Sequence, residues 1–309
     1  GAQGQNTLRI ATLAPRGSSW MKVFNAWNAS VKKETGGKLQ LRFYPGGVAG
    51  DERDFIRKMR AGQLDGAAVT STGLGQVVRP VLVLQVPGLF DEYSKLDKVR
   101  KQLDDEIEAK FEDNGYKLLG WGDVGKGRIF SNKPIKKPSD LKSTRPWAWR
   151  DDVIFSTFLD GVGANPVRLG VPEVYPALQT GMVDTVPASA LAAVSLQWFT
   201  KLTHVTKQSN SILIGATILK KDKYDALPDD QRKALMETSK KAHELLSRQI
   251  RRDDKRAYKT IKRRGMTEVD ISAHEGEWNK AAKKTRDKLA GRLFPKSLLQ
   301  RVQRAAGGG

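Results

Sequence analysis

The order of apolar and polar residues at the start of the chain predicts a strand, a helix and a second strand. Thr7–Leu13 forms the first strand and leads into a turn, after which Ser18 or Ser19 can cap the free amides of a helix. The apolar residues of this helix share one face because they are three or four positions apart: Trp20, Val23, Phe24, Trp27 and Val31. In Leu39–Tyr44 every second residue is apolar, which is typical of a strand.

The same alternation continues over the next stretch of chain. Asp51–Ala61 is a predicted helix that ends at Gly62, and Ala67–Thr70 is a short buried strand. A further helix of about five turns is marked by apolar residues at helical spacing, namely Leu96, Val99, Leu103, Ile107 and Phe111. Strands that alternate with helices require crossover connections, so the sequence predicts an α/β fold with a largely parallel sheet.

The pattern changes after Gly120, where four glycines come close together. Glycine tolerates the backbone conformations of a hinge, so we expect the chain to cross between two domains here. A second α/β unit then extends to about Ser211, the apolar strand Ile212–Leu219 returns to the first domain, and a long helical region runs from Pro228 to about Arg264. The predicted first domain is 1–124 plus about 212–250, and the second is 125–211 plus about 251–309.

Composition and charge narrow the class of protein. The 309 residues contain no cysteine, which excludes disulfides and thiol chemistry, and the longest apolar run falls short of the roughly 18 residues that cross a bilayer. The polar start Gly1-Ala-Gln-Gly-Gln5 is interpreted as a mature terminus from which an export signal was removed. The formal charge is +20, and residues 229–309, with 22 basic and 11 acidic residues, contribute +11 of it.

The sequence contains no recognisable motif for a catalytic or metal-binding site. His204, His243 and His274 are too far apart in the sequence for a metal motif, and neither a nucleophile elbow nor a phosphate-binding loop is present. Paired acids such as Asp104-Asp105 are typical of helix starts and surfaces. We therefore predict a protein that is not an enzyme and has neither a metal nor a cofactor.

A series of short motifs resembles one known family. The motifs occur in family order from Leu8 to about Met266: Glu34-Thr-Gly-Gly-Lys-Leu39, Tyr44-Pro-Gly-Gly47, Gly62-Gln-Leu-Asp65, Pro87-Gly-Leu-Phe90, Pro138-Ser-Asp-Leu-Lys142, Gly163-Ala-Asn-Pro166, Glu173-Val-Tyr-Pro-Ala-Leu-Gln-Thr-Gly-Met-Val-Asp184 and Leu227-Pro-Asp-Asp-Gln231. This series resembles the dicarboxylate-binding-type solute receptors of TRAP (tripartite ATP-independent periplasmic) transporters. Each tetrapeptide alone is weak evidence, but so many in the right order are strong evidence.

The resemblance implies an architecture and a function. It implies a two-domain clamp, like other periplasmic binding proteins, with crossing strands and long C-terminal helices, which closes over a small molecule in the periplasm. The closed form is then recognised by the membrane subunits of the transporter. Some receptors of this kind work with periplasmic tetratricopeptide-repeat proteins, and a basic surface suits such docking.

At the expected ligand site the sequence departs from the family. Family members that bind carboxylates usually hold the anion with an arginine on the strand after the D-L-K-G segment, and here Trp147 stands at that position. Arg145 lies two residues earlier and would point the same way on a regular strand, although Pro146 disturbs the register. The usual carboxylate clamp is therefore missing. The family's arginine in the F-R-x-F-x-N segment is retained as Arg128, which has a structural ion pair as its alternative role.

Other substitutions also make the predicted site less polar. Val186 and Ala188 replace a polar G-Q-E-N-P stretch, and Val171 stands where the family often has an aromatic residue. The remaining candidate walls are aromatic: Trp147, Trp149, Trp198 and Phe199, joined by Trp20 and Trp121. Core packing is the competing role for each, above all for Trp20. An apolar lining favours a hydrophobic or amphipathic ligand, because burial of apolar surface can supply affinity without a salt bridge.

Two alternatives stay open at this point. The first is an ordinary organic-acid receptor in which Arg128 or Arg145 replaces the missing clamp. The second is a protein that binds a polyanion or a membrane surface through its basic C-terminal helices, where Lys262-Arg-Arg264 is one of several basic clusters. The chain lacks the aromatic interleaving of nucleic-acid-binding proteins, so nucleic acid is not an expected partner.

Overall fold

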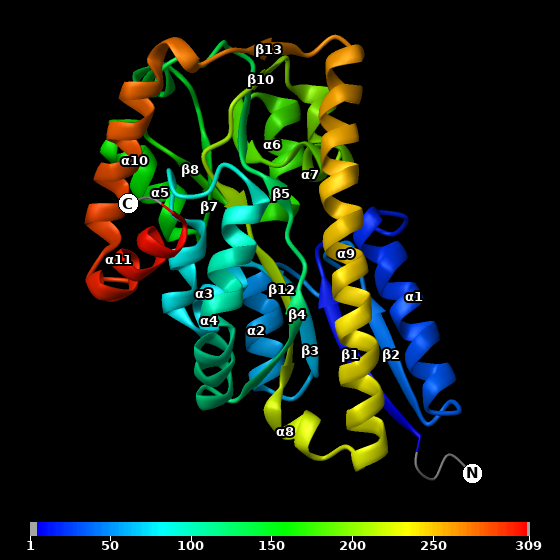
Figure 1. Ribbon diagram of the computed structural model, residues 1–309. Coiled ribbons are helices and arrows are strands. Elements are labelled where there is room, and N and C mark those ends of the chain that lie inside the picture. Colours follow the sequence, from blue (N-terminus) through cyan, green and yellow to red (C-terminus); the bar gives the residue numbers. More distant parts are fainter. Residues whose placement is uncertain (1–4, 308–309) are drawn as a thin grey trace. The chain divides into compact units, whose positions relative to one another are not determined.

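The computed structural model describes residues 5–307, and contacts between residues divide them into two compact units (Figure 1). Unit 1 contains the residues up to Val78 together with Asp105–Asp123 and Gly215–Arg252. Unit 2 contains Arg79–Asp104, Val124–Ile214 and the chain from Asp253 onward. The predicted assignment of residues 1–124 to one domain stays a prediction, and by contacts Arg79–Asp104 group with unit 2.

Unit 1 is built on a five-stranded mixed sheet. Its strands, in spatial order, are β2 (Leu39–Tyr44), β1 (Asn6–Thr12), β3 (Gly66–Thr70), β12 (Gly215–Lys220) and β4 (Tyr116–Trp121). The first three are parallel, as the alternation of strands and helices predicts. β12 is antiparallel to both of its neighbours, so the expectation of a largely parallel sheet was wrong on this side. The reason is that β12 enters from a distant part of the chain rather than through a crossover helix.

Unit 1 contains several helices, and a capping residue fixes the start of the first one. They are α1 (Ser19–Glu34), α2 (Glu52–Arg60), α3 (Ser71–Val77), α8 (Lys221–Asp225), the end of α4 (Tyr93–Asp113) and most of α9 (Asp229–Arg263). The Ser18 side chain accepts a hydrogen bond from the Met21 amide and caps α1, as predicted. The predicted core position of Trp27 is also confirmed, because Trp27 is 1% exposed and its ring meets the edge of His243 on α9.

Unit 2 is built on a four-stranded sheet with a short ladder beside it. The sheet order is β13 (Thr267–Val269), β10 (His204–Thr206), β6 (Arg128–Ser131) and β9 (Thr185–Ala188). β7 (Trp147–Trp149) and β8 (Val167–Leu169) form a parallel pair, and a bridge between Pro146 and Thr185 joins β7 to β9. β5 (Gly125–Lys126) and β11 (Ile212–Leu213) form a further antiparallel pair. The predicted strand Ile212–Leu219 is therefore two strands, β11 and β12, which lie in different units.

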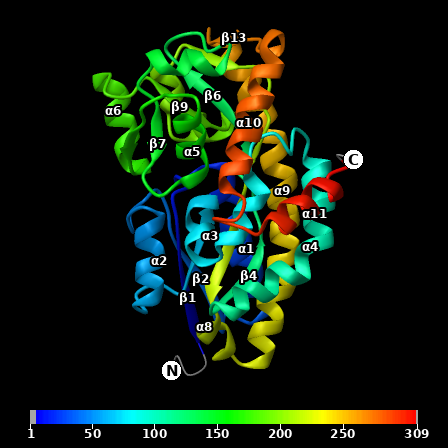
Figure 2. The ribbon, with the colours of Figure 1, turned by 90° about the vertical axis from the view of Figure 1, so that its left-hand side faces the viewer.

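One face of the unit 2 sheet packs against helices. The helical segments wholly in this unit are η1 (Arg79–Gln85), η2 (Pro138–Ser143), α5 (Val153–Gly161), η3 (Val171–Glu173), α6 (Val174–Thr180), α7 (Ala190–Ser195), η4 (Trp198–Lys201), η5 (Ser272–His274), α10 (Glu275–Leu289) and α11 (Lys296–Ala305). Figure 2 shows α5 and α10 side by side. Ala148 of β7, Phe158 of α5 and Trp278 of α10 share one hydrophobic core, with Ile129 of β6 packed against it.

The glycines between Gly120 and Gly127 have different physical roles. A Cβ added at Gly120 would lie 2.3 Å from Cγ of His243, and one at Gly122 would lie 2.4 Å from Cδ2 of Leu246. These two glycines therefore allow β4 and the following turn to approach α9 closely. Of the four predicted hinge glycines, only Gly125 has a positive φ, of 132°. Among residues 5–307, no helix is long and apolar enough to span a membrane.

Candidate functional site

The strand register of unit 2 places several predicted site residues on one face of its sheet. Arg128 of β6 pairs with Ala188 of β9, and two residues along the strand Phe130 pairs with Val186. The bridge between Pro146 and Thr185 then sets Trp147 beside Val186. Laterally paired residues point to the same face, and successive residues alternate. Ala148 and Ile129 belong to the helix-covered face, so the alternate positions lie on the opposite face, which we call the ligand face: Arg128, Phe130, Trp147, Trp149, Val186 and Ala188.

Trp147 is the centre of an aromatic cluster on the ligand face. Its side chain is 3% exposed, and its indole N–H donates a 3.0 Å hydrogen bond to the carbonyl oxygen of Leu169 on β8. Its ring meets Trp198 edge-to-face with 5.3 Å between ring centroids, and it lies 6.0 Å from the ring of Trp149. Edge-to-face aromatic pairs are favourable beyond their buried area. The indole of Trp147 is thus fixed by packing and by a satisfied N–H group.

Val171 and Phe199 come from segments that flank this cluster. Val171 is buried at the start of η3, directly after β8. Phe199 follows Trp198 in η4 and is only partly buried, with the Arg264 guanidinium 5.8 Å from its ring centroid. Trp198 is buried, whereas Trp149 is partly exposed. The cluster therefore has a rigid centre at Trp147 and Trp198 and a more accessible edge at Trp149 and Phe199.

Arg128 is the cation of the ligand face. Its guanidinium stacks on the ring of Tyr258 with 3.9 Å between Cζ and the ring centroid, and its Nη1 donates to the carbonyl oxygens of Thr206 and Lys207. Its Nε is buried and has no hydrogen-bond partner among the residues that the structure describes. The contacts of Arg128 are thus an aromatic ring and backbone acceptors, where the sequence left a structural ion pair open. Two inter-strand spacings and a two-residue offset along the strands separate it from Trp147, a distance of about 12 Å between backbones.

Tyr258 is a site residue that the sequence analysis missed. It lies on α9, where its hydroxyl donates to Glu268, and Lys262 forms a 2.9 Å ion pair with the same carboxylate. Burial, followed by the hydrogen bond to Glu268, raises the pKa of Tyr258 above its ordinary value, so the ring stays neutral. The quadrupole of this neutral ring attracts the guanidinium over its face. No motif marks Tyr258, because its partner is 130 residues earlier in the chain.

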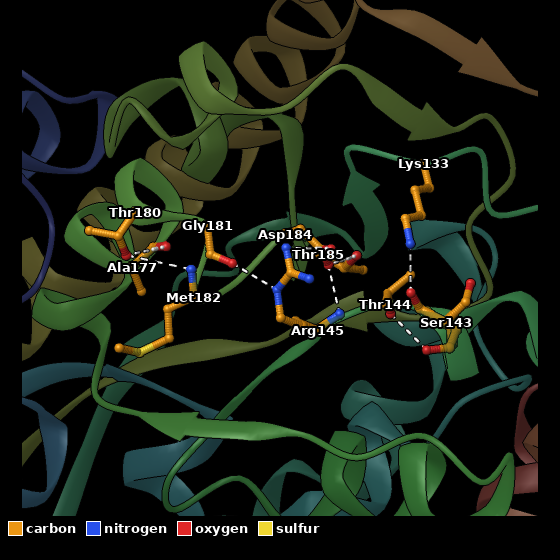
Figure 3. A network of polar contacts seen from close by, with 11 residues as sticks. Lys133, Ser143, Thr144, Arg145, Ala177, Thr180, Gly181, Met182, Asp184 and Thr185 are labelled. Carbon is orange, nitrogen blue, oxygen red and sulfur yellow. Dashed lines mark hydrogen bonds and ion pairs between the residues drawn. The ribbon is translucent and has the colours of Figure 1, made fainter.

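Arg145 is held within its own loop (Figure 3). Its Nε donates a 2.7 Å hydrogen bond to the Gly181 carbonyl, and its guanidinium pairs with Asp184 at 3.4 Å. The Asp184 carboxylate also accepts from the Arg145 backbone amide at 2.8 Å and from the Thr185 hydroxyl at 3.0 Å. These contacts tie the entry of β7 to the entry of β9 and so set the position of Trp147. The arrangement fits a residue that positions the site better than one that holds a ligand.

Trp20 and Trp121 lie in unit 1 and are described separately. Trp20 is 9% exposed at the start of α1, and its indole N–H donates a 3.2 Å hydrogen bond to the Asp123 carbonyl. Trp121 ends β4, where it pairs with Ala216 and is partly exposed. The two residues therefore belong to the same region of unit 1, around the end of β4.

The chemistry available on the ligand face is that of binding. It offers apolar and aromatic surface with one guanidinium. No group of three or more histidine, cysteine or acidic residues that could hold a metal ion occurs in residues 5–307. Apolar and aromatic side chains with one fixed charge are typical of sites that bind small molecules.

Comparison with known proteins gives the family. Residues 10–292 match the family described as DctP, bacterial extracellular solute-binding protein, family 7. The chain therefore belongs to this family. It is the solute-binding subunit of a TRAP transporter, a receptor rather than an enzyme, and it acts outside the cytoplasm with membrane subunits.

Relatives with curated names are similar over most of their length. The 2,3-diketo-L-gulonate-binding periplasmic protein YiaO of Escherichia coli is 25% identical over 258 residues, which are 80% of this chain and 76% of YiaO. The C4-dicarboxylate-binding periplasmic protein DctP of Rhodobacter capsulatus is 24% identical over 300 residues, which are 92% of this chain and 85% of that protein.

Solved structures share the fold. DctP7 of Bordetella pertussis, an extracytoplasmic solute receptor binding pyroglutamic acid, superposes with a TM-score of 0.89 at 19% identity and covers 98% of this chain and 99% of its own. A TRAP periplasmic solute binding protein of Sulfurospirillum deleyianum with bound succinate gives a TM-score of 0.90 at 20% identity, over 97% of this chain and 98% of its own. The predicted two-domain α/β class of a solute-receptor clamp is thereby confirmed.

Proposed function

We propose that this subunit is a periplasmic receptor for an amphipathic small molecule that lies on the ligand face of unit 2. The observation that carries the proposal is Trp147. The motif register predicts this indole at the position of the family's anion-binding arginine, and the indole's only N–H group is already bonded to Leu169. Trp147 can therefore offer a ligand apolar contact but not a salt bridge.

The size of the apolar contribution supports this ligand class. A molecule that loses about 200 Å² of its own apolar surface against the partly exposed edge at Trp149 and Phe199 gains about 5 kcal/mol. That is about the affinity of a ligand with a dissociation constant in the upper micromolar range before orientation costs are counted. Additional affinity then has to come from a polar end group.

Arg128 supplies a place for that end group. Its charge is fixed by the Tyr258 ring and by two backbone carbonyls, about 12 Å from Trp147 across the sheet. A fixed guanidinium loses little entropy when it pairs with an anion. The proposed ligand therefore has an anionic group near Arg128 and an apolar body that extends toward Trp147.

A second candidate is a receptor for a small, polar organic acid. It is favoured by the solved receptors of this fold whose described ligands are carboxylates, namely pyroglutamic acid and succinate. In that case Arg128 is the better candidate for the anion, because Arg145 is already bonded to Gly181 and Asp184. The predicted tetratricopeptide-repeat partner and the removed export signal stay predictions.

The test is to identify what the protein carries when it is purified natively. We expect solvent extraction and mass spectrometry to recover an amphipathic molecule from the wild type, and less of it from Trp147→Arg and from Arg128→Gln. Trp278→Phe, altered in the opposite core of the same unit, should retain it. Because a buried arginine can unfold the unit, Trp149→Ala is a second, milder variant on the partly exposed edge.

Two outcomes would overturn the proposed ligand class. One is recovery of a small polar carboxylate that Trp147→Arg retains or binds more tightly, which returns the protein to the organic-acid receptors. The other is a ligand whose amount does not change in any of the three ligand-face variants.

A further inference from the structure

The exposed side of α9 carries a stripe of basic residues that the proposed function does not use. α9 is one helix from Asp229 to Arg263 (Figure 1). At 3.6 residues per turn, six of its lysines and arginines fall within an arc of about 80°. These residues, which we call the basic stripe, are Lys241, Arg248, Arg252, Lys255, Lys259 and Arg263. All six are exposed.

The basic stripe lies opposite the apolar side of the same helix. Leu246, Ile250 and Ile261 are each 1% exposed and are centred about half a turn away from the stripe. The stripe therefore faces solvent because the helix must bury its other side. With a rise of 1.5 Å per residue, its length from Lys241 to Arg263 is about 33 Å.

The composition of the stripe is unusually one-sided. No acidic residue falls in its arc between Lys241 and Arg263, and the last ten residues of this region, 255–264, contain basic residues but no acidic ones. A single large apolar side chain, Leu245, lies in the arc and is 40% exposed. A solvated helix face normally mixes both signs of charge, because alternating charges stabilise the helix.

We propose that the basic stripe binds the anionic phospholipid surface of the membrane that holds the transporter. A long row of one charge matches a laterally uniform anionic plane, and basic residues near such a surface add their attractions. Leu245 can enter the headgroup region among the basic side chains. An acidic protein surface is less well matched, because protein interfaces have an apolar centre with charge at the rim. Membrane attachment keeps the receptor near the subunits it serves.

The proposal is tested by vesicle sedimentation with the whole protein. The probes are phosphatidylcholine vesicles with and without phosphatidylglycerol, each at low and at high sodium chloride concentration. We expect the wild type to sediment only with the phosphatidylglycerol vesicles and only at low salt. Each neutralised stripe residue should lower the partition coefficient about fivefold, so Lys241→Gln/Arg248→Gln/Lys255→Gln/Lys259→Gln should lower it about 100-fold or more.

A matched variant separates the stripe from the overall charge. Lys22→Gln/Lys32→Gln/Lys33→Gln/Lys38→Gln removes the same charge from other exposed positions and should change the partition coefficient less than about threefold. Circular dichroism confirms that both variants fold.

Three results would overturn the proposal. The first is equal binding of the wild type to both kinds of vesicle, and the second is an equal loss in the stripe variant and in its matched control. The third is stripe-dependent binding to the membrane subunits in neutral phosphatidylcholine nanodiscs without any binding to anionic vesicles, which would assign the stripe to a protein partner.

Discussion

Trp147 and Trp278 form a natural pair for separating ligand contact from stability. Both are buried in unit 2, at 3% and 5% exposure, and both donate an indole hydrogen bond to a backbone carbonyl. The donor–acceptor distances are 3.0 Å from Trp147 to Leu169 and 2.9 Å from Trp278 to Lys136. They lie on opposite faces of the sheet, because Trp278 packs in the core around Ala148 whereas Trp147 lies on the ligand face.

Replacing either tryptophan by phenylalanine removes one indole donor, but the expected costs differ. The Lys136 carbonyl loses the donor from Trp278, at about 1–3 kcal/mol, whereas the Leu169 carbonyl keeps the Arg150 amide at 3.1 Å and loses only the net value of one hydrogen bond, about 0.5–1.5 kcal/mol. Each change also removes roughly 40 Å² of buried ring, at about 1 kcal/mol. We therefore expect Trp147→Phe to destabilise unit 2 by about 1.5–2.5 kcal/mol and Trp278→Phe by about 2–4 kcal/mol. Only Trp147→Phe should reduce the amount of co-purifying ligand, because only Trp147 lies on the ligand face.

Hydrogen exchange of the unit 2 strand amides measures the local free energy of opening without assuming that the whole chain unfolds in two states. Mass spectrometry of the extracted ligand gives the second readout. A cost below about 0.5 kcal/mol for Trp147→Phe, beside the expected cost for Trp278→Phe, would refute the packing argument. Equal loss of ligand from both variants would show that instability, rather than contact, controls binding.

Three further predictions concern the framework. Burial raises the pKa of Glu52 from 4.5 to about 8, so the folded state keeps a proton that the unfolded state loses between these pH values. The free energy of unfolding should therefore fall by up to about 1.4 kcal/mol per pH unit as the pH rises from 4.5 to 8. Glu52→Gln should flatten this slope in urea titrations. Gly120→Ala, whose Cβ would lie 2.3 Å from His243, should cost about 1–3 kcal/mol in thermal unfolding, whereas Gly276→Ala on an open helix surface should be neutral or stabilising. Asp184→Ala removes the acceptor of a 2.8 Å backbone hydrogen bond and should cost about 2–4 kcal/mol, and a change below 1 kcal/mol would contradict the role of this network.

Local signals in the sequence were sufficient to predict where many of the helices and strands lie. α1 begins after Ser18 and the long helix α9 spans Asp229–Arg263, close to the predicted limits. Both are set by interactions within a few residues, namely capping hydrogen bonds and the helical spacing of apolar side chains. The family also followed from the sequence, because its motifs are short stretches whose order survives at low identity.

The pairing of the strands could not be predicted from the local pattern of apolar residues. Ile212–Leu219 is largely apolar and predicts one strand, yet the chain divides it between β11 and β12. An apolar run fits any buried strand, and only its partners decide where it ends and in which direction it runs.

The candidate site illustrates the same division. The side-chain direction of Trp147 follows from its place in a strand, and that Trp147 replaces the family's arginine stays a prediction from the motif register. That Arg128, Val186 and Trp147 share one face depends on pairing between three strands from distant parts of the chain. The ion pair between Arg145 and Asp184 and the stacking of Arg128 on Tyr258 are likewise contacts between residues far apart in the sequence. The sequence alone determined the family, the helix limits and the types of residue at the site. Only the tertiary structure decided which of those residues meet, because side-chain direction is a local property of the backbone and strand pairing is not.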